Sequence, residues 1–250
     1  MATSTQSAPD PSGRRRQPPE RRGTLGTPLL LLNLKAYPES VGPAALPLGR
    51  LLQRLGERLG VPTAVAASAP DLGTLARSLT IPVLAQHADD VPPGARTGWM
   101  VPAALHAAGV KGSLLGHSEH PLPDRDLPGL VRRLRTLGLA SVICAGEDRQ
   151  AIRRARQGHP DYLAVEPPEL IGGHVSVSAA RPEVITRSVR GIRRASRNTR
   201  VLCGAGIHNG EDVRRALELG AEGVLLASAV TLSPAPGQVL RDLLSGFSRR

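Results

Sequence analysis

Residues 200–228 read RVLCGAGIHNGEDVRRALELGAEGVLLAS, and this stretch indicates the fold of the chain. The apolar runs Arg200–Cys203 and Gly223–Leu226 are typical of short buried strands. Between them, residues 210–219 have helical character, with two acidic residues in the first turn. A strand, a helix and a second strand in succession predict a βαβ unit, whose two strands lie parallel in one sheet.

The same alternation extends outward from this unit along the rest of the chain. We expect further strands at 29–34, 63–67, 83–86, 112–115, 140–144 and 162–165, and helices at 47–60, 70–79, 102–108, 127–137, 148–156, 181–196 and 236–244. The strands are almost continuously apolar, as strands buried on both faces are. Eight such units predict the α/β class and a single (β/α)8 barrel. A doubly wound open sheet is the alternative, but its glycine fingerprint usually follows the first strand, whereas Gly-x-Gly here follows the seventh.

The composition is that of one large domain with an aliphatic core. The chain has 250 residues, of which 40% are hydrophobic, but only one Trp, one Phe and two Tyr. No apolar run approaches the roughly 20 residues that span a bilayer, and the N-terminus lacks the apolar region of a signal peptide. Cys144 and Cys203 lie in apolar runs and do not form a CxxC pair. We therefore expect a cytoplasmic protein that has no membrane partner.

The net charge of +11 raises the question of nucleic-acid binding. The first 22 residues hold five arginines in a segment rich in Pro, Ser and Gly, which predicts a disordered basic tail at residues 1–27. The catalytic barrel is then expected at residues 28–248. The other arginines are spread over helix faces without an aromatic stacking platform, so we expect no nucleic-acid partner.

Polar residues follow the predicted strands at their carboxyl ends. Asn33 and Lys35 follow the first strand, His117 the fourth and Glu166 the sixth. Only two of the 32 basic residues are lysine, so Lys35 marks a place where a compact ammonium is favoured over a guanidinium. Because the active sites of such barrels lie at the carboxyl ends of the strands, these four residues predict an active site.

Two further kinds of segment on this rim have compositions typical of a phosphate-binding site and of a lid. Residues 204–206 (GAG) and the pair Ala227-Ser228 follow the seventh and eighth strands, where barrel enzymes often bind phosphate through backbone N–H groups. Residues 165–173 read VEPPELIGG, in which two prolines stiffen the strand exit and two glycines permit close approach. This pattern predicts a lid beside Glu166. A tight turn at 204–206 and a surface loop with a solvated Glu166 are the simpler interpretations.

The segment His117-Ser118-Glu119-His120 has two other interpretations. It resembles an ordinary helix start with Ser118 as the N-cap. It also contains residue types that bind metals, but the spacing of the HExxH motif is absent and no third ligand set is apparent. We therefore expect no metal and no other cofactor.

The four rim residues suit proton transfer beside a carbonyl group. A carboxylate such as Glu166 takes a proton from carbon, and a neutral imidazole at His117 donates to the developing oxyanion. We expect the amino end of a helix to hold the pKa of His117 down. Lys35 stabilises the negative charge of an enediolate, and the lid excludes water.

Several motifs in order resemble the triosephosphate isomerase family, in particular its shorter, archaeal-type branch. They are NLK at 33–35, GHSE at 116–119, VEPPELIG at 165–172, LCGAGI at 202–207 and VLLAS at 224–228. The resemblance extends over roughly residues 28–246 and implies interconversion of glyceraldehyde 3-phosphate and dihydroxyacetone phosphate. It implies a small phosphorylated triose as the substrate and a homodimer or homotetramer as the assembly.

The resemblance also implies roles for individual residues. Glu166 would be the base, His117 the electrophile, and Glu119 a carboxylate near Lys35. The substrate contacts that it implies are Asn33, Lys35, Ile171, Gly172, Gly206, Ala227 and Ser228.

Two departures from the family pattern leave alternatives open. The lid runs Ile171-Gly172-Gly173-His174 where Ile-Gly-Thr-Gly is common, and His120-Pro121 follows the histidine motif where a basic residue is common. The altered lid permits a related isomerase of a four-carbon phosphosugar. A barrel that only binds a phosphometabolite, with the basic tail as its docking arm, is the third possibility.

Overall fold

The computed structural model describes residues 25–166 and 182–248. Two of the expected substrate contacts, Ile171 and Gly172, lie outside the described residues, as does most of the basic tail.

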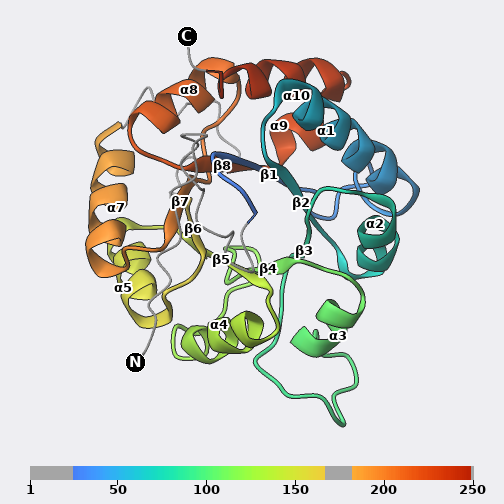
Figure 1. Ribbon diagram of the computed structural model, residues 1–250, viewed down its shortest axis with the longest axis vertical. Helices are drawn as coiled ribbons and strands as arrows, with labels where there is room; N and C mark the ends of the chain where they lie inside the picture. Colours follow the sequence, from blue (N-terminus) through green and yellow to red (C-terminus); the bar gives the residue numbers. More distant parts are fainter. Residues whose placement is uncertain (1–24, 167–181, 249–250) are drawn as a thin grey trace, which may run out of the picture.

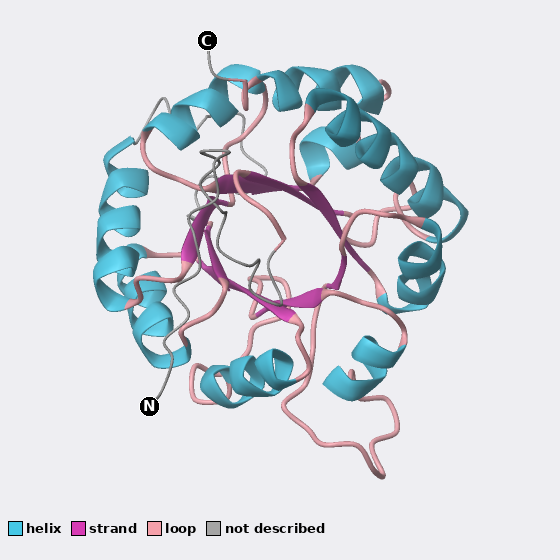
Figure 2. Ribbon diagram, in the orientation of Figure 1, coloured by secondary structure: helices cyan, strands magenta, loops and turns pink. Residues whose placement is uncertain are grey.

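Eight parallel strands form a closed barrel in chain order, which confirms the predicted (β/α)8 fold (Figures 1 and 2). The strands are β1 (Leu29–Asn33), β2 (Thr63–Ala67), β3 (Val83–Ala85), β4 (Gly112–Leu115), β5 (Ala140–Ala145), β6 (Tyr162–Val165), β7 (Arg200–Cys203) and β8 (Gly223–Leu226). The barrel closes where β1 pairs with β8, with Leu29 opposite Gly223 and Leu32 opposite Leu226.

Helices follow the strands and form an outer ring around the barrel (Figure 2). They are α1 (Ala45–Leu59), α2 (Leu72–Ser78), α3 (Pro102–Ala107), α4 (Leu127–Thr136), α5 (Asp148–Gly158), α7 (Pro182–Ala195), α8 (Gly210–Glu218), α9 (Ser228–Thr231) and α10 (Pro236–Ser245), with short 3-10 turns at Gly42–Ala44 and Ala69–Asp71. The short helix α9 was not predicted from the sequence. It begins directly at the rim position Ser228, after β8.

Alternate strand residues point into the barrel and toward the helices, and this alternation places the polar rim residues. In β1, Leu29 and Leu31 pack inside the barrel, whereas Leu30 and Leu32 pack in the layer between barrel and helices. Asn33 therefore belongs to the inward series. Glu166 follows the inward residues Tyr162 and Ala164 of β6 by the same period of two.

The amino end of the barrel is closed by the first described residues. The Leu25 side chain is 6% exposed, and its backbone N–H donates to the Tyr162 hydroxyl oxygen at 3.0 Å. That hydroxyl donates to the Gly26 carbonyl at 3.1 Å. Within the described residues, barrel contacts are already present at Leu25, three residues before the boundary drawn from the sequence.

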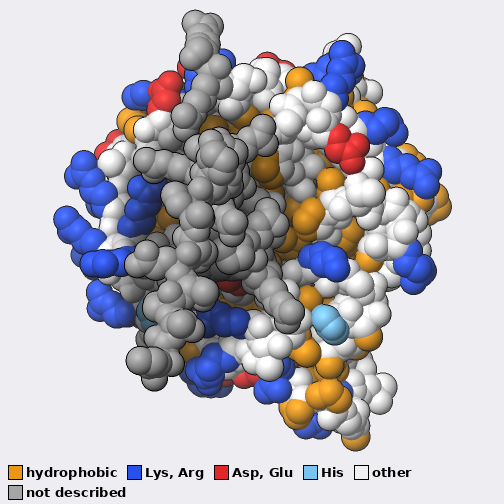
Figure 3. All heavy atoms as spheres, in the orientation of Figure 1, with side chains coloured by type: hydrophobic (Ala, Val, Ile, Leu, Met, Phe, Trp, Pro, Cys, Tyr) orange, Lys and Arg blue, Asp and Glu red, His pale blue; other side chains and the backbone are white. Residues whose placement is uncertain are grey.

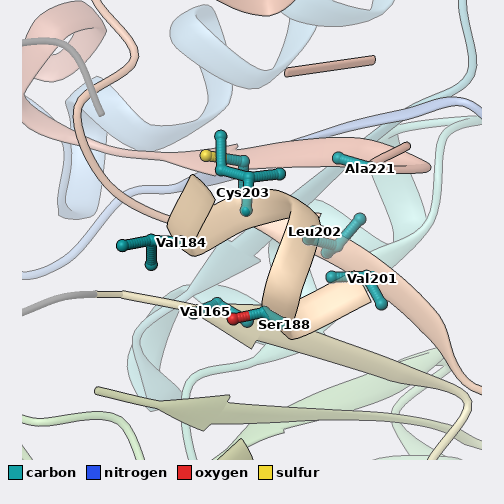
Figure 4. A pocket seen from close by; sticks show the side chains of 8 residues that line it. Val165, Val184, Ser188, Val201, Leu202, Cys203 and Ala221 are labelled. Carbon is teal, nitrogen blue, oxygen red and sulfur yellow. The ribbon is translucent and has the colours of Figure 1, made fainter. Parts of the chain in front are cut away.

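A small apolar cavity of about 10 Å³ lies under α7 (Figure 4). Val184 and Ser188 of α7 line it together with Val165 of β6 and Cys203 of β7. The Ser188 hydroxyl donates to Asp148, so it is already bonded. A site this small and apolar is a packing gap and has no room for a substrate.

Charged side chains on the face seen in Figure 3 are distributed around the ring of helices and do not gather in one patch. Within residues 25–166 and 182–248, no helix combines the length and apolar character that crossing a bilayer requires.

Candidate active site

The first rim residues are held in a strained turn after β1. Lys35 has a φ of 52°, a left-handed conformation that is uncommon for residues with a side chain. Its N–H donates to Asn33 Oδ1 at 3.0 Å. The Gln86 amide donates to the same Asn33 oxygen at 3.1 Å and to the Lys35 carbonyl at 3.0 Å. These bonds stabilise the turn and direct the Lys35 side chain.

The Lys35 ammonium forms an ion pair with Glu119, a carboxylate from the loop after β4. The distance from Lys35 Nζ to Glu119 Oε1 is 2.6 Å, with the Lys35 side chain 14% exposed. The expected neighbour of Lys35 therefore lies where the family resemblance implied it. Because the pair joins the ends of β1 and β4, it fixes the ammonium at the rim.

His117 lies in the same loop and is held as a neutral imidazole. The Glu119 backbone N–H donates to His117 Nδ1 at 3.2 Å, so Nδ1 is an acceptor and the ring proton belongs on Nε2. Burial lowers the pKa of His117, and the positive charge of Lys35 lowers it further, while Glu119 acts in the opposite direction.

This cause differs from the one predicted from the sequence, which was the amino end of a helix. Residues 117–126, all of which the structure describes, contain no helix, and α4 begins only at Leu127. The interpretation of Ser118 as a helix N-cap is wrong for the same reason. The predicted lowering of the His117 pKa itself agrees with the structure.

Glu166 is a buried carboxyl group at the carboxyl end of β6. It is 4% exposed, and its backbone N–H donates to the Ala145 carbonyl at 2.8 Å, which continues the ladder to β5. Burial raises the pKa of Glu166 to about 8, against the lowering effects of the Cys144 thiol hydrogen bond and of Lys35. A carboxyl group with such a pKa exchanges its proton near neutral pH, as a general base must.

Gly204, at the end of β7, makes room for the Glu166 side chain. A Cβ atom at residue 204 would lie 2.4 Å from Glu166 Cγ and 3.2 Å from its Oε1. The Gly204 N–H donates to the Val165 carbonyl at 2.9 Å, which holds the two strand ends together. The first glycine of the GAG motif therefore leaves space for the Glu166 side chain, in addition to any role in a turn.

His117 and Glu166 face each other across the rim although they come from different strands. His117 Nε2 and Glu166 Oε1 are 3.7 Å apart. A hydrogen donor and a proton acceptor at this spacing can act together on two adjacent atoms of one small molecule.

Gly206, Ala227 and Ser228 follow β7 and β8, the two strands that precede the closure with β1. Gly206 has a φ of 65°, a left-handed conformation that glycine adopts without strain. The first residue of α9 is Ser228, so its N–H group lies at the start of a helix, where the helix has no carbonyl partner of its own to offer. These residues have the backbone features of an anion site on the same rim as Lys35.

His120 does not turn toward the candidate site. Its ring stacks on that of His87, with ring centroids 4.0 Å apart, and His87 Nε2 lies 3.1 Å from Asp89 Oδ1. In the part of the chain that the structure describes, no group of three or more His, Cys, Asp or Glu residues is placed to hold a metal ion.

Two residues of this site, Gln86 and Cys144, were not recognised from the sequence, and Gly204 was singled out only as part of a phosphate-binding segment or a tight turn. Gln86 ends the predicted third strand, so the rule that singled out Asn33 also applies to it. Cys144 was interpreted only as a small buried hydrophobe, and nothing in the sequence places its thiol against Glu166. The contact depends on how β5 and β6 pair.

Comparison with known proteins gives one consistent result. A family model described as triosephosphate isomerase matches residues 28–239. The triosephosphate isomerase of Methanopyrus kandleri is 44% identical over 225 residues, which cover 89% of this chain and 99% of that protein. The triosephosphate isomerase of Methanothermobacter thermautotrophicus is 42% identical, covering 88% and 95%, and that of Methanocaldococcus jannaschii is 39% identical, covering 86% and 98%.

Proposed function

Because this chain belongs to the triosephosphate isomerase family, we propose that it interconverts glyceraldehyde 3-phosphate and dihydroxyacetone phosphate. The relatives quoted above are all named triosephosphate isomerase, which favours a three-carbon substrate over the four-carbon alternative. The buried pair of His117 and Glu166 favours catalysis over a role in binding alone.

We propose Glu166 as the base. Its carboxylate removes a proton from the carbon next to the carbonyl group, and the electron pair of that C–H bond forms the enediolate double bond. The same carboxyl group returns the proton to the neighbouring carbon, so no group is gained or lost. Because burial raises its pKa to about 8, the carboxyl group re-protonates carbon readily.

We propose His117 as the electrophile and Lys35 as the cation that stabilises the charge. The Nε2 proton of a neutral imidazole is donated to the carbonyl oxygen as negative charge develops there, and Nε2 regains a proton from the hydroxyl group of the neighbouring carbon, which becomes the new carbonyl group. The Lys35 ammonium attracts the anionic substrate and favours the enediolate. Asn33 acts with Lys35 as a polar contact, since its side chain fixes the turn that carries the ammonium.

The phosphate is proposed to bind at the ends of β7 and β8, between the strand ends that carry Glu166 and Lys35. Gly206, Ala227 and Ser228 offer backbone N–H groups there, and the resemblance adds Ile171 and Gly172 as residues that close over the phosphate. The observation that carries the proposal is the 3.7 Å approach of His117 Nε2 to Glu166 Oε1, with His117 Nδ1 already accepting a backbone N–H.

The direct test is a coupled assay of dihydroxyacetone phosphate formation from glyceraldehyde 3-phosphate. We expect fast turnover in the unaltered protein and a loss of several orders of magnitude in Glu166→Gln, which cannot accept the proton. Glu166→Asp moves the carboxylate back by one methylene, so we expect kcat to fall by roughly two to three orders of magnitude with a small change in KM.

Either of two results contradicts this proposal. Unchanged turnover in Glu166→Gln rules out Glu166 as the base. Slow turnover on the three-carbon substrate with fast turnover on a four-carbon ketose phosphate moves the assignment to the alternative isomerase.

We also propose that the protein is a cytoplasmic homodimer or homotetramer. Trp99, the one tryptophan in the chain, is 53% exposed in the long loop between β3 and α3, which projects from the ring in Figure 1. Leu59 and Leu232 are also large exposed apolar residues, at 43% and 49%. Exposed large apolar side chains, one of them on a projecting loop, favour burial against another subunit.

Light scattering and Trp99 fluorescence across a dilution series test this assembly. We expect a mass of two or four chains at micromolar concentration, and a red shift of the emission as dilution exposes Trp99. A single-chain mass with concentration-independent emission contradicts it.

A further inference from the structure

Arg154 is a buried charged residue that the proposed mechanism does not use. It lies on α5 and is only 5% exposed, although an arginine is rarely buried so completely without paired groups. Its Nε donates to Asp124 Oδ1 at 2.7 Å. The neighbouring Arg153 donates to the other oxygen of the same carboxylate at 2.8 Å, but its side chain is 51% exposed.

The remaining bonds of Arg154 go to two backbone carbonyl groups next to the candidate active site. Its Nη1 donates to the Cys144 carbonyl, and it lies 3.4 Å from the Gly116 carbonyl. Gly116 directly precedes His117 in the chain. Cys144 carries the thiol that hydrogen-bonds Glu166. One guanidinium group therefore bonds to the residue before His117 and to the residue whose thiol contacts Glu166.

We propose that Arg154 is a positioning residue that fixes the distance between the electrophile and the base. This inference rests on the proposed isomerase activity. The end of β4 and the end of β5 are held in one arrangement because a single rigid group bonds to a carbonyl of each. His117 follows β4 and Glu166 follows β6, and β5 lies between these two strands. The 3.7 Å distance from His117 Nε2 to Glu166 Oε1 therefore depends on how the ends of β4 and β5 are held.

The geometry requires an arginine. A guanidinium presents five N–H donors in a planar fork and reaches one carboxylate and two carbonyl groups at once, whereas an ammonium presents a single centre. Asp124 fixes the orientation of the fork. Burial raises the pKa of Asp124, but its bonds to Arg154 and Arg153 outweigh burial and keep the pKa below its usual value. The carboxylate is therefore ionised whenever the enzyme works.

The test compares Arg154→Lys with the matched control Arg153→Lys. Both changes keep the charge beside Asp124, but only Arg154→Lys removes donors from the Gly116 and Cys144 carbonyls. We expect kcat to fall by about tenfold to a hundredfold in Arg154→Lys with KM within about twofold, because misplacing catalytic groups acts on the transition state. The control is expected to stay within about twofold in both constants.

A second readout separates positioning from general loss of structure. If the β5 end shifts, the Cys144 thiol no longer stabilises the ionised Glu166, so the limb of kcat/KM that rises with pH should move to higher pH in Arg154→Lys. A purely structural role would lower the amount of active enzyme and leave this limb in place.

The double variant Arg154→Met with Asp124→Asn keeps the test valid if the single variant is unstable. It removes the buried Arg154 charge together with the partly exposed Asp124 carboxylate that pairs with it, which avoids leaving a buried charge unpaired and favours a folded barrel. We expect it to fold and to retain a low kcat. Wild-type kcat in this variant or in Arg154→Lys would overturn the inference, whereas absence of turnover in the unaltered protein would instead reject the proposed function.

Discussion

Glu166 combines a buried carboxyl group with a working pKa near neutrality. In the folded chain its pKa is about 8, against 4.5 for an ordinary glutamate. The folded state therefore binds a proton more tightly than the unfolded state between these values. Folding costs more free energy as pH rises through this window, because the carboxyl group must then be ionised in a site of low polarity.

Glu166→Gln should remove this pH dependence. We expect the variant to be more stable than the unaltered protein by several kcal/mol, roughly 3–5, above pH 8, and the difference to vanish near pH 4.5. Denaturant unfolding of both proteins at a series of pH values measures it.

His117 must be accounted for in that comparison. Burial lowers the pKa of His117, so this residue contributes folding stability that is lost as pH falls below about 6.5. Its pH dependence is therefore opposite in sign to that of Glu166. Both proteins keep His117, so subtracting one curve from the other isolates Glu166. A difference that is constant across the pH range contradicts the raised pKa.

The ends of β6 and β7 fit together only because residue 204 has no side chain. Gly204 does not adopt a left-handed φ, so its backbone suits alanine, and the nearest atoms that an added Cβ would meet all belong to Glu166. Neighbouring strand ends thus form a slot for the carboxylate.

Gly204→Ala should displace Glu166 and lower kcat by about tenfold to a hundredfold, with a loss of roughly 1–3 kcal/mol in stability. Gly237→Ala is the matched control, because its Cβ would meet only ordinary contacts at 3.7 Å or more in α10. That change should leave kcat unaltered and stabilise by up to about 1 kcal/mol. Steady-state kinetics measure kcat and denaturant unfolding measures the stability of each variant. Equal kcat in the two variants would show that Gly204 is not needed to make room for Glu166.

At the scale of the whole chain, buried contacts determine where the barrel begins at its amino-terminal end. We propose that residues 1–23 are not needed for the stability of the barrel, whereas Leu25 and Gly26, at the end of the predicted basic tail, close its amino end through the Tyr162 hydroxyl. This end lies at the start of β6, and Glu166 follows the other end of that strand.

Two truncations test that boundary. Deleting residues 2–23 should leave the melting temperature within about 2 °C and kcat unchanged. Deleting residues 2–27 should cost about 2–4 kcal/mol, since the buried Leu25 side chain and two hydrogen bonds are lost, with kcat still unchanged because the rim is distant. Equal melting temperatures for the two variants would show that Leu25 does not stabilise the barrel.

Much of the fold and part of the site could be predicted from local patterns. Strand and helix periods are local, so the eight units and the inward position of Asn33 and Glu166 follow from short runs of residues. The cause of the lowered His117 pKa could not be predicted, because it depends on burial and on the charge of Lys35, which lies 82 residues earlier.

The sequence by itself determined the barrel, the rim on which the polar residues gather and the family whose motifs they match. Only the tertiary structure decided which groups touch: Gln86 on the Lys35 turn, the Cys144 thiol on Glu166, Gly204 beneath it and Arg154 behind both strand ends. The physical reason is that periodicity and propensity act over a few neighbouring residues. Burial, charge interactions and steric fit depend on residues that are distant in the chain and meet only when the barrel closes.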